Sequence, residues 1–209
     1  GGARHDRSWG AAGVPTRGRG RRLDAVLEAL PELLAGRPAQ IQPGEPPVEF
    51  APAAVMPPVL VGGNSEAALG RAAKHGSGWW PLGGTPEEIA AARTRLAEMA
   101  RAHDRPVPAL NGSLMTAVSG DPALPSRDVL LRELEDPDGP YGIPAEAIGQ
   151  MFSNDTPAEL AERMEAWAQI GVERVIVTLA GGDWFRQAEL LAEARRLLPG
   201  VAAVRACPG

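Results

Sequence analysis

The stretch PVLVGGNSEAALGRAAKHGSGWW, residues 58–80, decides the fold, because a short apolar run breaks at two glycines and restarts as a helix. Residues 59–61 have the branched, apolar character of a buried strand. The two glycines permit a sharp turn, and Asn64 or Ser65 can cap the helix that follows. Trp79 and Trp80 begin a second strand. The stretch therefore predicts a strand, a glycine turn, a helix and a strand.

The glycine turn is also the strongest candidate for a binding site. The first N–H groups of a helix have no partner inside the helix, and a glycine turn presents them to a phosphate or another anion. A tight turn between a strand and a helix has the same pattern when it binds nothing. The residues alone leave both interpretations open.

Several runs of this chain resemble the luciferase-like monooxygenase family of flavin- and deazaflavin-dependent oxidoreductases. Besides residues 58–80, the runs are GGAR at 1–4, AAGVP at 11–15, RGRGRRLD at 17–24, TPAELAER at 156–163 and GVERVIV at 171–177. The sequence departs from the family pattern at Ser77, where an acidic residue is usual, and at Ala25.

This resemblance implies an α/β fold, a partial (β/α)8 TIM barrel of the bacterial-luciferase type that lacks roughly the first four βα units. We expect one domain over residues 1–209. Within it we expect a loop at 1–20, a proline-rich excursion at 37–57 and an insertion at 120–154 whose structure the sequence does not predict.

The resemblance also implies the function. We expect a flavin- or deazaflavin-dependent oxidoreductase or monooxygenase that acts on a small organic substrate, with either FMN or coenzyme F-420 as the cofactor. No catalytic residue can be named in this chain, because the family's polar residues for that role come largely from the early strands. The residues implied in cofactor binding are Gly2, Arg22, Gly62, Gly63, Asn64, Ser65, Gly78 and Trp79.

Two of these assignments, and four other residues, have simpler structural interpretations. Arg21 and Arg22 fit a solvated basic loop as well as a phosphate contact. Either Trp79 or Trp80 can pack its indole beneath a loop, and for Trp80 we favour that role. His75 suits a helix end, and Asp183 fits a helix N-cap better than a general base.

Composition excludes several classes of function. A formal net charge of −5 argues against nonspecific binding to nucleic acid, and no apolar run approaches the ~18 residues of a membrane-spanning helix. Cys207 is the only cysteine, and the three histidines do not have metal-ligand spacing. We therefore expect a cytoplasmic protein without a metal site.

The rest of the chain reads as alternating helices and strands. We predict helices at 21–35, 85–102, 156–170 and 184–198, of which the second and third begin with the capping sequences TPEE and TPAE. We predict strands at 109–118 and 174–179.

An alternative function follows from an incomplete barrel. Four strands that do not close into a barrel would leave unpaired backbone groups at the sheet edges and exposed apolar faces, which favour association between chains. The alternative is therefore a non-catalytic half-barrel that associates with itself or pairs with another chain. In either case we expect a homo-oligomer.

Overall fold

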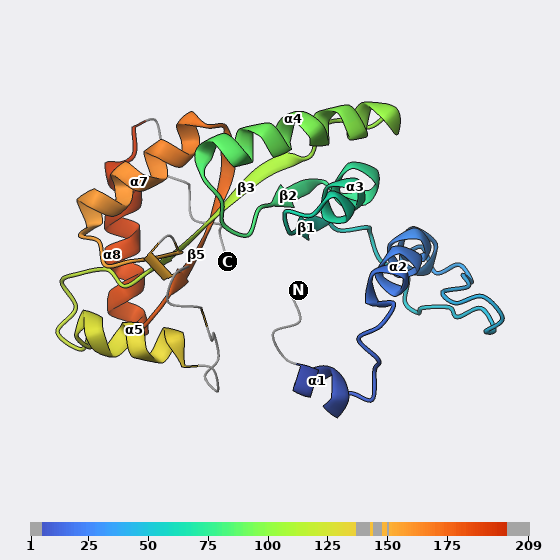
Figure 1. The fold of residues 1–209 in the computed structure, drawn as a ribbon, viewed down its shortest axis with the longest axis horizontal. Helices are drawn as coiled ribbons and strands as arrows, with labels where there is room; N and C mark the ends of the chain where they lie inside the picture. The colour runs from blue at the N-terminus through green and yellow to red at the C-terminus, as the bar shows by residue number, and fades with distance from the viewer. Residues whose placement is uncertain (1–5, 137–142, 144–147, 150, 200–209) are drawn as a thin grey trace. The chain divides into compact units, whose positions relative to one another are not determined.

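The structure is a computed structural model that describes residues 6–136, 143, 148–149 and 151–199 (Figure 1). Its helices are α1 (Asp6–Ala11), α2 (Arg19–Leu34), α3 (Glu66–His75), α4 (Pro86–Ala102), α5 (Arg127–Glu135), α7 (Pro157–Gln169) and α8 (Trp184–Leu197). Its strands are β1 (Leu60–Gly62), β2 (Gly78–Trp80), β3 (Ala109–Thr116), β4 (Phe152–Ser153) and β5 (Val172–Leu179). The chain divides into two compact units, Gly1–Trp80 with Ala91–Ala109, and Pro81–Ala90 with Leu110–Gly209. The expectation of a single domain stays a prediction.

The first unit contains the predicted strand, turn, helix and strand. β1 and β2 are parallel, with Leu60 opposite Gly78 and Gly62 opposite Trp80. Between them, α3 buries one face made of small and apolar side chains, Ala68, Leu69, Ala72 and Ala73. The prediction for residues 58–80 is confirmed, with the first strand starting and ending one residue later.

α2 and α1 complete the N-terminal part of the first unit. α2 confirms the predicted helix, although it begins earlier, and it continues through Pro31 as far as the turn at Gly36. α1 corrects the expected loop at 1–20. It is only six residues long, too short to show a helical period, and it ends where the Val14 N–H donates to the Trp9 carbonyl beside Gly13.

The proline-rich excursion at 37–57 contains no strand. Its one isolated β-bridge is antiparallel, between Ala39 and Val48, with N···O distances of 2.9 and 3.0 Å. Prolines remove backbone donors, which limits pairing of this segment to that bridge.

The second unit is built on a long parallel pair of strands. β3 and β5 pair from Leu110 and Val172 to Thr116 and Leu179, with one irregularity after Leu110. α7 packs against α8 and also against β5. Both predicted capping boxes form: Thr156 and Glu159 exchange hydrogen bonds at α7, and Thr85 and Glu88 do so at α4.

The segment 120–154 supplies two elements that the sequence did not predict. α5 buries Leu130 and Leu134, and β4 pairs in parallel with the end of β3, where Met115 lies opposite Phe152. Phe152 belongs to an apolar cluster with those two leucines. The described residues therefore contain five strands rather than the expected four.

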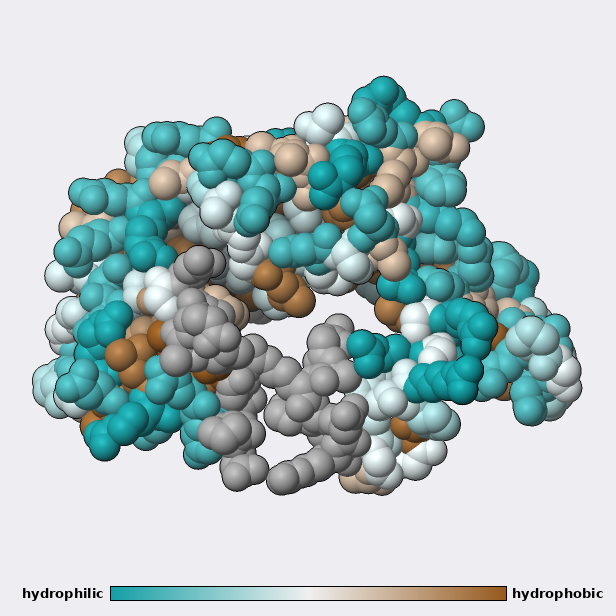
Figure 2. Space-filling model, viewed as in Figure 1, coloured by the Kyte–Doolittle hydropathy of each residue, from teal (hydrophilic) through white to brown (hydrophobic). Residues whose placement is uncertain are grey.

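The surface is consistent with the composition. In Figure 2, hydrophilic residues cover much of the visible face, and apolar residues form only small patches between them. No helix in the described part of the chain is long and apolar enough to cross a membrane.

Candidate functional site

The glycine turn is hydrogen-bonded to the two residues that end β2. The Gly63 N–H donates to the Trp80 carbonyl oxygen at 3.0 Å, and the Trp79 indole Nε1 donates to the Gly63 carbonyl oxygen at 2.8 Å. Gly63 has a φ of 119°, a conformation that side-chain-bearing residues rarely adopt. The turn is thus fixed by its backbone, and the Gly63 N–H is already used by the protein.

Ser65 caps the helix that follows the turn. It has extended backbone, and its Oγ accepts the Ala68 N–H at 3.2 Å. The N–H groups of Glu66 and Ala67 come before the first residue that can bond back within the helix. These two donors, at the positive end of the α3 dipole, are the groups that this turn can offer to an anion.

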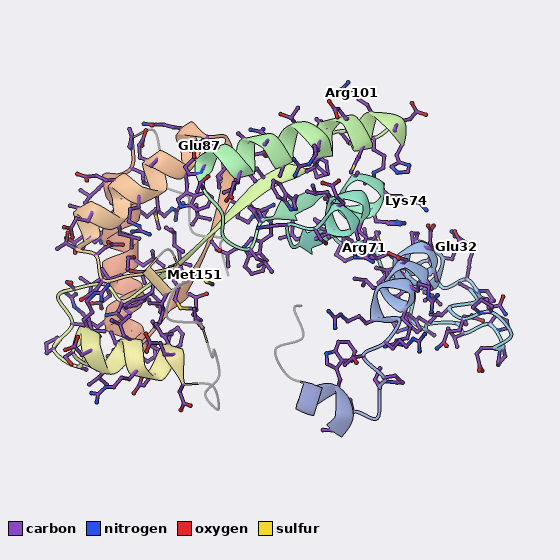
Figure 3. The ribbon with its side chains drawn as sticks, viewed as in Figure 1. Glu32, Arg71, Lys74, Glu87, Arg101 and Met151 are labelled. Carbon is purple, nitrogen blue, oxygen red and sulfur yellow. The ribbon has the colours of Figure 1, made fainter. Side chains whose placement is uncertain are left out.

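α2 places a second helix N-terminus at the same end. Asp24 of α2 pairs with Arg71 of α3 at 2.5 Å, and one turn later Glu28 pairs with Lys74. Figure 3 shows Arg71 and Lys74 on the side of α3 that faces α2. Because the contacts advance in the same direction along both helices, α2 and α3 run in the same sense. Their N-termini therefore lie at one end of the pair.

These ion pairs affect the acid–base properties of the α2–α3 contact. The hydrogen bond from Arg71 lowers the pKa of Asp24, and the hydrogen bond from Lys74 lowers the pKa of Glu28. Burial lowers the pKa of His75, although the Glu28 carboxylate lies 3.6 Å from its Nε2. His75 ends α3, about 14 Å along the helix axis from the turn, so it is not brought to the candidate anion site.

The structure places the other predicted cofactor residues as follows. Gly78 is buried in β2 opposite Leu60, one strand away from the turn. Arg22, in the first turn of α2, donates through Nη1 to the Arg17 carbonyl at 3.0 Å and through Nη2 to the Pro15 carbonyl. Asn64 is exposed within the turn. Gly2 lies outside the described residues.

The two tryptophans of β2 have different surroundings. Trp79 is 1% exposed and its indole donates to the Gly63 carbonyl of the turn, the packing role that the sequence allows for either residue. The Trp80 indole Nε1 is buried and has no hydrogen-bond partner among the described residues. Strand alternation predicts that the two indoles point to opposite faces of β2, but it does not say which face is buried.

The turn after β5, in the second unit, is closed by a buried polar network. Asp121 accepts the Asp183 N–H at 2.8 Å, the Gln187 amide at 3.1 Å and the Ala123 N–H at 2.9 Å. Burial alone would raise the pKa of Asp121, but these hydrogen bonds together lower it by more, so the net shift of the pKa is downward. Gln187 bonds both backbone groups of Val118. Each polar group already has partners, so this network stabilises the turn.

Asp183 has the structural role that the sequence favoured. Its side chain accepts the Arg186 N–H at 2.9 Å as the N-cap of α8. Among the described residues, no group of three or more histidine, cysteine, aspartate or glutamate residues could hold a metal ion.

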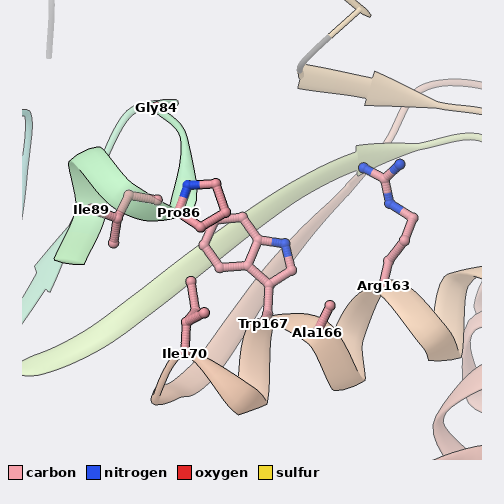
Figure 4. A pocket seen from close by; sticks show the side chains of 7 residues that line it. All are labelled: Gly84, Pro86, Ile89, Arg163, Ala166, Trp167 and Ile170. Atoms are coloured by element: carbon pink, nitrogen blue, oxygen red, sulfur yellow. The ribbon is translucent and has the colours of Figure 1, made fainter.

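A pocket of about 220 Å³ lies in the second unit, and none of the predicted cofactor residues lines it. Figure 4 shows the Trp167 indole rising from α7 toward Pro86 and Ile170, while Arg163 extends away from them. Its lining residues are Gly84, Pro86, Ile89, Arg163, Ala166, Trp167 and Ile170. The walls are mainly apolar, and the pocket is smaller than typical small-molecule sites. Among its lining residues the one charged group is the Arg163 guanidinium, which can contact an anion.

Comparison with solved structures shows the fold. A monooxygenase from Streptomyces bottropensis superposes with a TM-score of 0.68 at 18% identity, over 94% of this chain and 66% of that one. An F420-dependent secondary alcohol dehydrogenase superposes with a TM-score of 0.61 at 13% identity, over 80% of this chain and 58% of that one. EDTA monooxygenase from Chelativorans sp. BNC1 superposes with a TM-score of 0.62 at 13% identity, over 90% of this chain and 62% of that one. The fold is therefore that of the luciferase-like α/β barrel, and the chain spans about 60% of the length of these neighbours.

Comparison by sequence shows the family. Uncharacterized proteins of Mycobacterium bovis and Mycobacterium tuberculosis are 40% identical over 82 residues, which is 37% of this chain and 28% of each relative. The chain spans little more than a quarter of those relatives. The model of the luciferase-like monooxygenase family matches residues 1–174. With most of its residues matched by that model, and with the barrel fold of its structural neighbours, the chain belongs to the luciferase-like monooxygenase family.

Proposed function

We propose that this chain binds the phosphate of a flavin or deazaflavin cofactor at the glycine turn, as part of an oxidoreductase that acts on a small organic substrate. The observation that carries the proposal is the geometry of the turn. Gly63 is fixed in a conformation suited to glycine, and the N–H groups of Glu66 and Ala67 follow a capped helix start. The N-terminus of α2 adds a second positive dipole at the same end of the helix pair.

The named neighbours support the choice of cofactor class but not the choice between two members of it. One is F420-dependent, and another is a riboflavin lyase whose structure contains a modified FMN. Both cofactors carry a phosphate on a flexible chain and a planar ring that exchanges a hydride when bound. The protein's contribution at this turn is to hold and orient the cofactor. Among the predicted residues, Ser65 and Gly63 shape the turn, and Asn64 lies at its exposed rim.

Arg22 and Gly78 have indirect roles in this proposal. Arg22 bonds to two carbonyls of the loop before α2, so it fixes the start of that helix and adds positive charge near it. Gly78 pairs with Leu60 in the β1–β2 ladder that carries the turn. Trp79 supports the turn from the buried side. Gly2 remains a predicted contact.

One substitution can remove a single proposed donor with little effect on the helix. In Glu66→Pro, the first helical residue loses its N–H, and proline is favoured at that position. The residue before a proline must be extended, and Ser65 already has φ −73° and ψ 153°. Glu66→Ala is the matched control, because it loses the same carboxylate and the same 3.0 Å pair with Arg95 but keeps the N–H.

The experiment is a titration of both variants with FMN and with coenzyme F-420, followed by cofactor fluorescence. A hydrogen bond to a charged group contributes about 1.5–3 kcal/mol, so Glu66→Pro should bind the preferred cofactor at least about tenfold more weakly than Glu66→Ala. Equal affinities in the two variants, with similar unfolding midpoints, would place the phosphate elsewhere. Failure of the wild-type chain to bind either cofactor would reject the proposal.

A self-associating chain is the second candidate, and one observation favours it. Trp184 and Phe185, adjacent at the start of α8, are 70% and 84% exposed. We propose that this aromatic pair contributes to a homo-oligomer. In sedimentation experiments Phe185→Ser should shift the chain toward the monomer, whereas Val55→Ser, at a side chain that is 93% exposed, should not. A wild-type chain that is monomeric at all concentrations would reject this candidate.

A further inference from the structure

Trp80 carries a buried hydrogen-bond donor that the protein does not use. Its indole Nε1 has no acceptor among the described residues, although its own carbonyl oxygen accepts the Gly63 N–H. Leaving a buried N–H without an acceptor is unfavourable, and most buried indoles in proteins have one. The Trp80 side chain therefore has one unfilled hydrogen bond, on the residue whose backbone carbonyl binds the glycine turn.

The two faces of the β1–β2 pair differ in how they are covered. Val61 and Trp79 are opposite one another and both are buried, and the Trp79 indole donates to the Gly63 carbonyl of the turn that precedes α3. Leu60 and Gly62 of β1 are both exposed. Because side chains alternate along a strand, Gly62 and Trp80 lie on the face opposite to Val61 and Trp79.

On that second face, the neighbour of Trp80 has no side chain. Gly62 is its partner across the strands, and a Cβ built on Gly62 would have only the Trp80 carbonyl oxygen within 4 Å, at 3.8 Å. The space over Gly62 is therefore open, and the residue that pairs with Gly62 across the strands carries a large planar indole. A flat ring fits such a surface, because aromatic groups pack favourably in offset or edge-on contact.

We propose that Trp80 is a cofactor-binding residue whose indole N–H donates to a carbonyl oxygen on the planar ring of the flavin or deazaflavin. The inference rests on the proposed function, since the phosphate at the turn would place the rest of the cofactor near this face. Trp79 then supports the turn, and Trp80 contacts the ligand. This assignment reverses the roles that the sequence alone suggested for the two tryptophans.

The direct test is to follow the indole N–H signals of the five tryptophans by ¹H–¹⁵N NMR during a titration with FMN. We expect the Trp80 indole signal to move downfield and to exchange more slowly with water, because its N–H gains an acceptor. The signal of Trp184, which is 70% exposed at the start of α8, should not move and serves as the internal control. The same titration with coenzyme F-420 covers the deazaflavin.

A second measurement uses Trp80→Phe, which keeps an aromatic ring and removes the donor. We expect it to raise the dissociation constant of the cofactor about tenfold. If the cofactor binds in a phosphate-dependent way but the Trp80 signal stays in place, this inference is wrong and the proposed function stands. If neither cofactor binds, both are wrong. An unchanged affinity in folded Trp80→Phe would also overturn the inference.

Discussion

Replacing Gly63 by alanine should destabilise the first unit, because the path of the turn depends on the positive φ of this residue. Its φ of 119° lies outside the conformations that an alanine adopts without strain, and a Cβ there would lie 3.2 Å from the Ala68 Cβ. A sparsely populated backbone conformation costs about 1–3 kcal/mol. If the turn shifts to relieve that strain, it also weakens the hydrogen bonds to Trp79 and Trp80, each worth about 0.5–1.5 kcal/mol.

The matched control is the neighbouring glycine. Gly62 does not have positive φ, and a Cβ there would meet only one atom, at an ordinary van der Waals distance of 3.8 Å. We therefore expect Gly63→Ala to lower the free energy of unfolding by about 2–4 kcal/mol, whereas Gly62→Ala should change it by less than about 1 kcal/mol.

The assay is urea unfolding of the two variants and the wild-type chain, followed by tryptophan fluorescence and by circular dichroism. The chain has two compact units, so coincidence of the two probes decides whether a single free energy applies. Trp79 reports on the turn directly, since its indole is hydrogen-bonded to Gly63. Equal stability of Gly63→Ala and Gly62→Ala would refute the reasoning, because it would mean that the turn relaxes without loss.

Three further predictions concern other parts of the fold. Gln187→Met should lower the free energy of unfolding by about 2–4 kcal/mol, because it leaves both backbone groups of buried Val118 unpaired; a loss below 1 kcal/mol in urea unfolding would show that water replaces the amide. Thr156→Ala should cost about 1 kcal/mol through the lost capping box of α7, measured as a lower midpoint by circular dichroism, and no change would argue against the cap. The pKa values of Asp24 and Glu28 are lowered in the folded chain, so their contribution to stability is present above their unfolded pKa values, near 4, and is lost as pH falls through the folded values. The unfolding midpoint of the wild-type chain should thus fall more steeply below about pH 4 than that of Asp24→Asn/Glu28→Gln, and parallel curves would contradict this.

Local signals were sufficient to predict much of the fold. The double glycine predicted the turn, and Asn64 or Ser65 was predicted to cap α3, where Ser65 is the cap. The TPEE and TPAE sequences predicted the starts of α4 and α7. These features depend on residues close in sequence, and their chemistry is specific. The run VERVIVT predicted β5 for the same reason, because branched apolar residues dominate it.

Elements defined by distant contacts could not be predicted in the same way. β4 has only two residues, and it is a strand because it pairs with the end of β3 and buries Phe152. α1 is too short to show a period. The network of Asp121 and Gln187 joins residues far apart in the sequence, which no local pattern reveals.

The candidate site also has a part that the sequence predicts and a part that depends on packing. The turn itself could be predicted from the residues between Gly62 and Ser65. The separate surroundings of Trp79 and Trp80 could not be assigned, because which face of β2 is covered by α3 depends on packing. The strand alternation was present in the sequence, but it needed one known face to become informative.

The most direct test of the central claim compares a cofactor with and without its phosphate. The wild-type chain is titrated with FMN and with riboflavin, which has the same ring and lacks the phosphate. If the turn at Gly63 and the N–H groups of Glu66 and Ala67 receive that phosphate, FMN should bind at least about tenfold more tightly, a difference of about 1.4 kcal/mol. Equal dissociation constants for FMN and riboflavin would contradict the account.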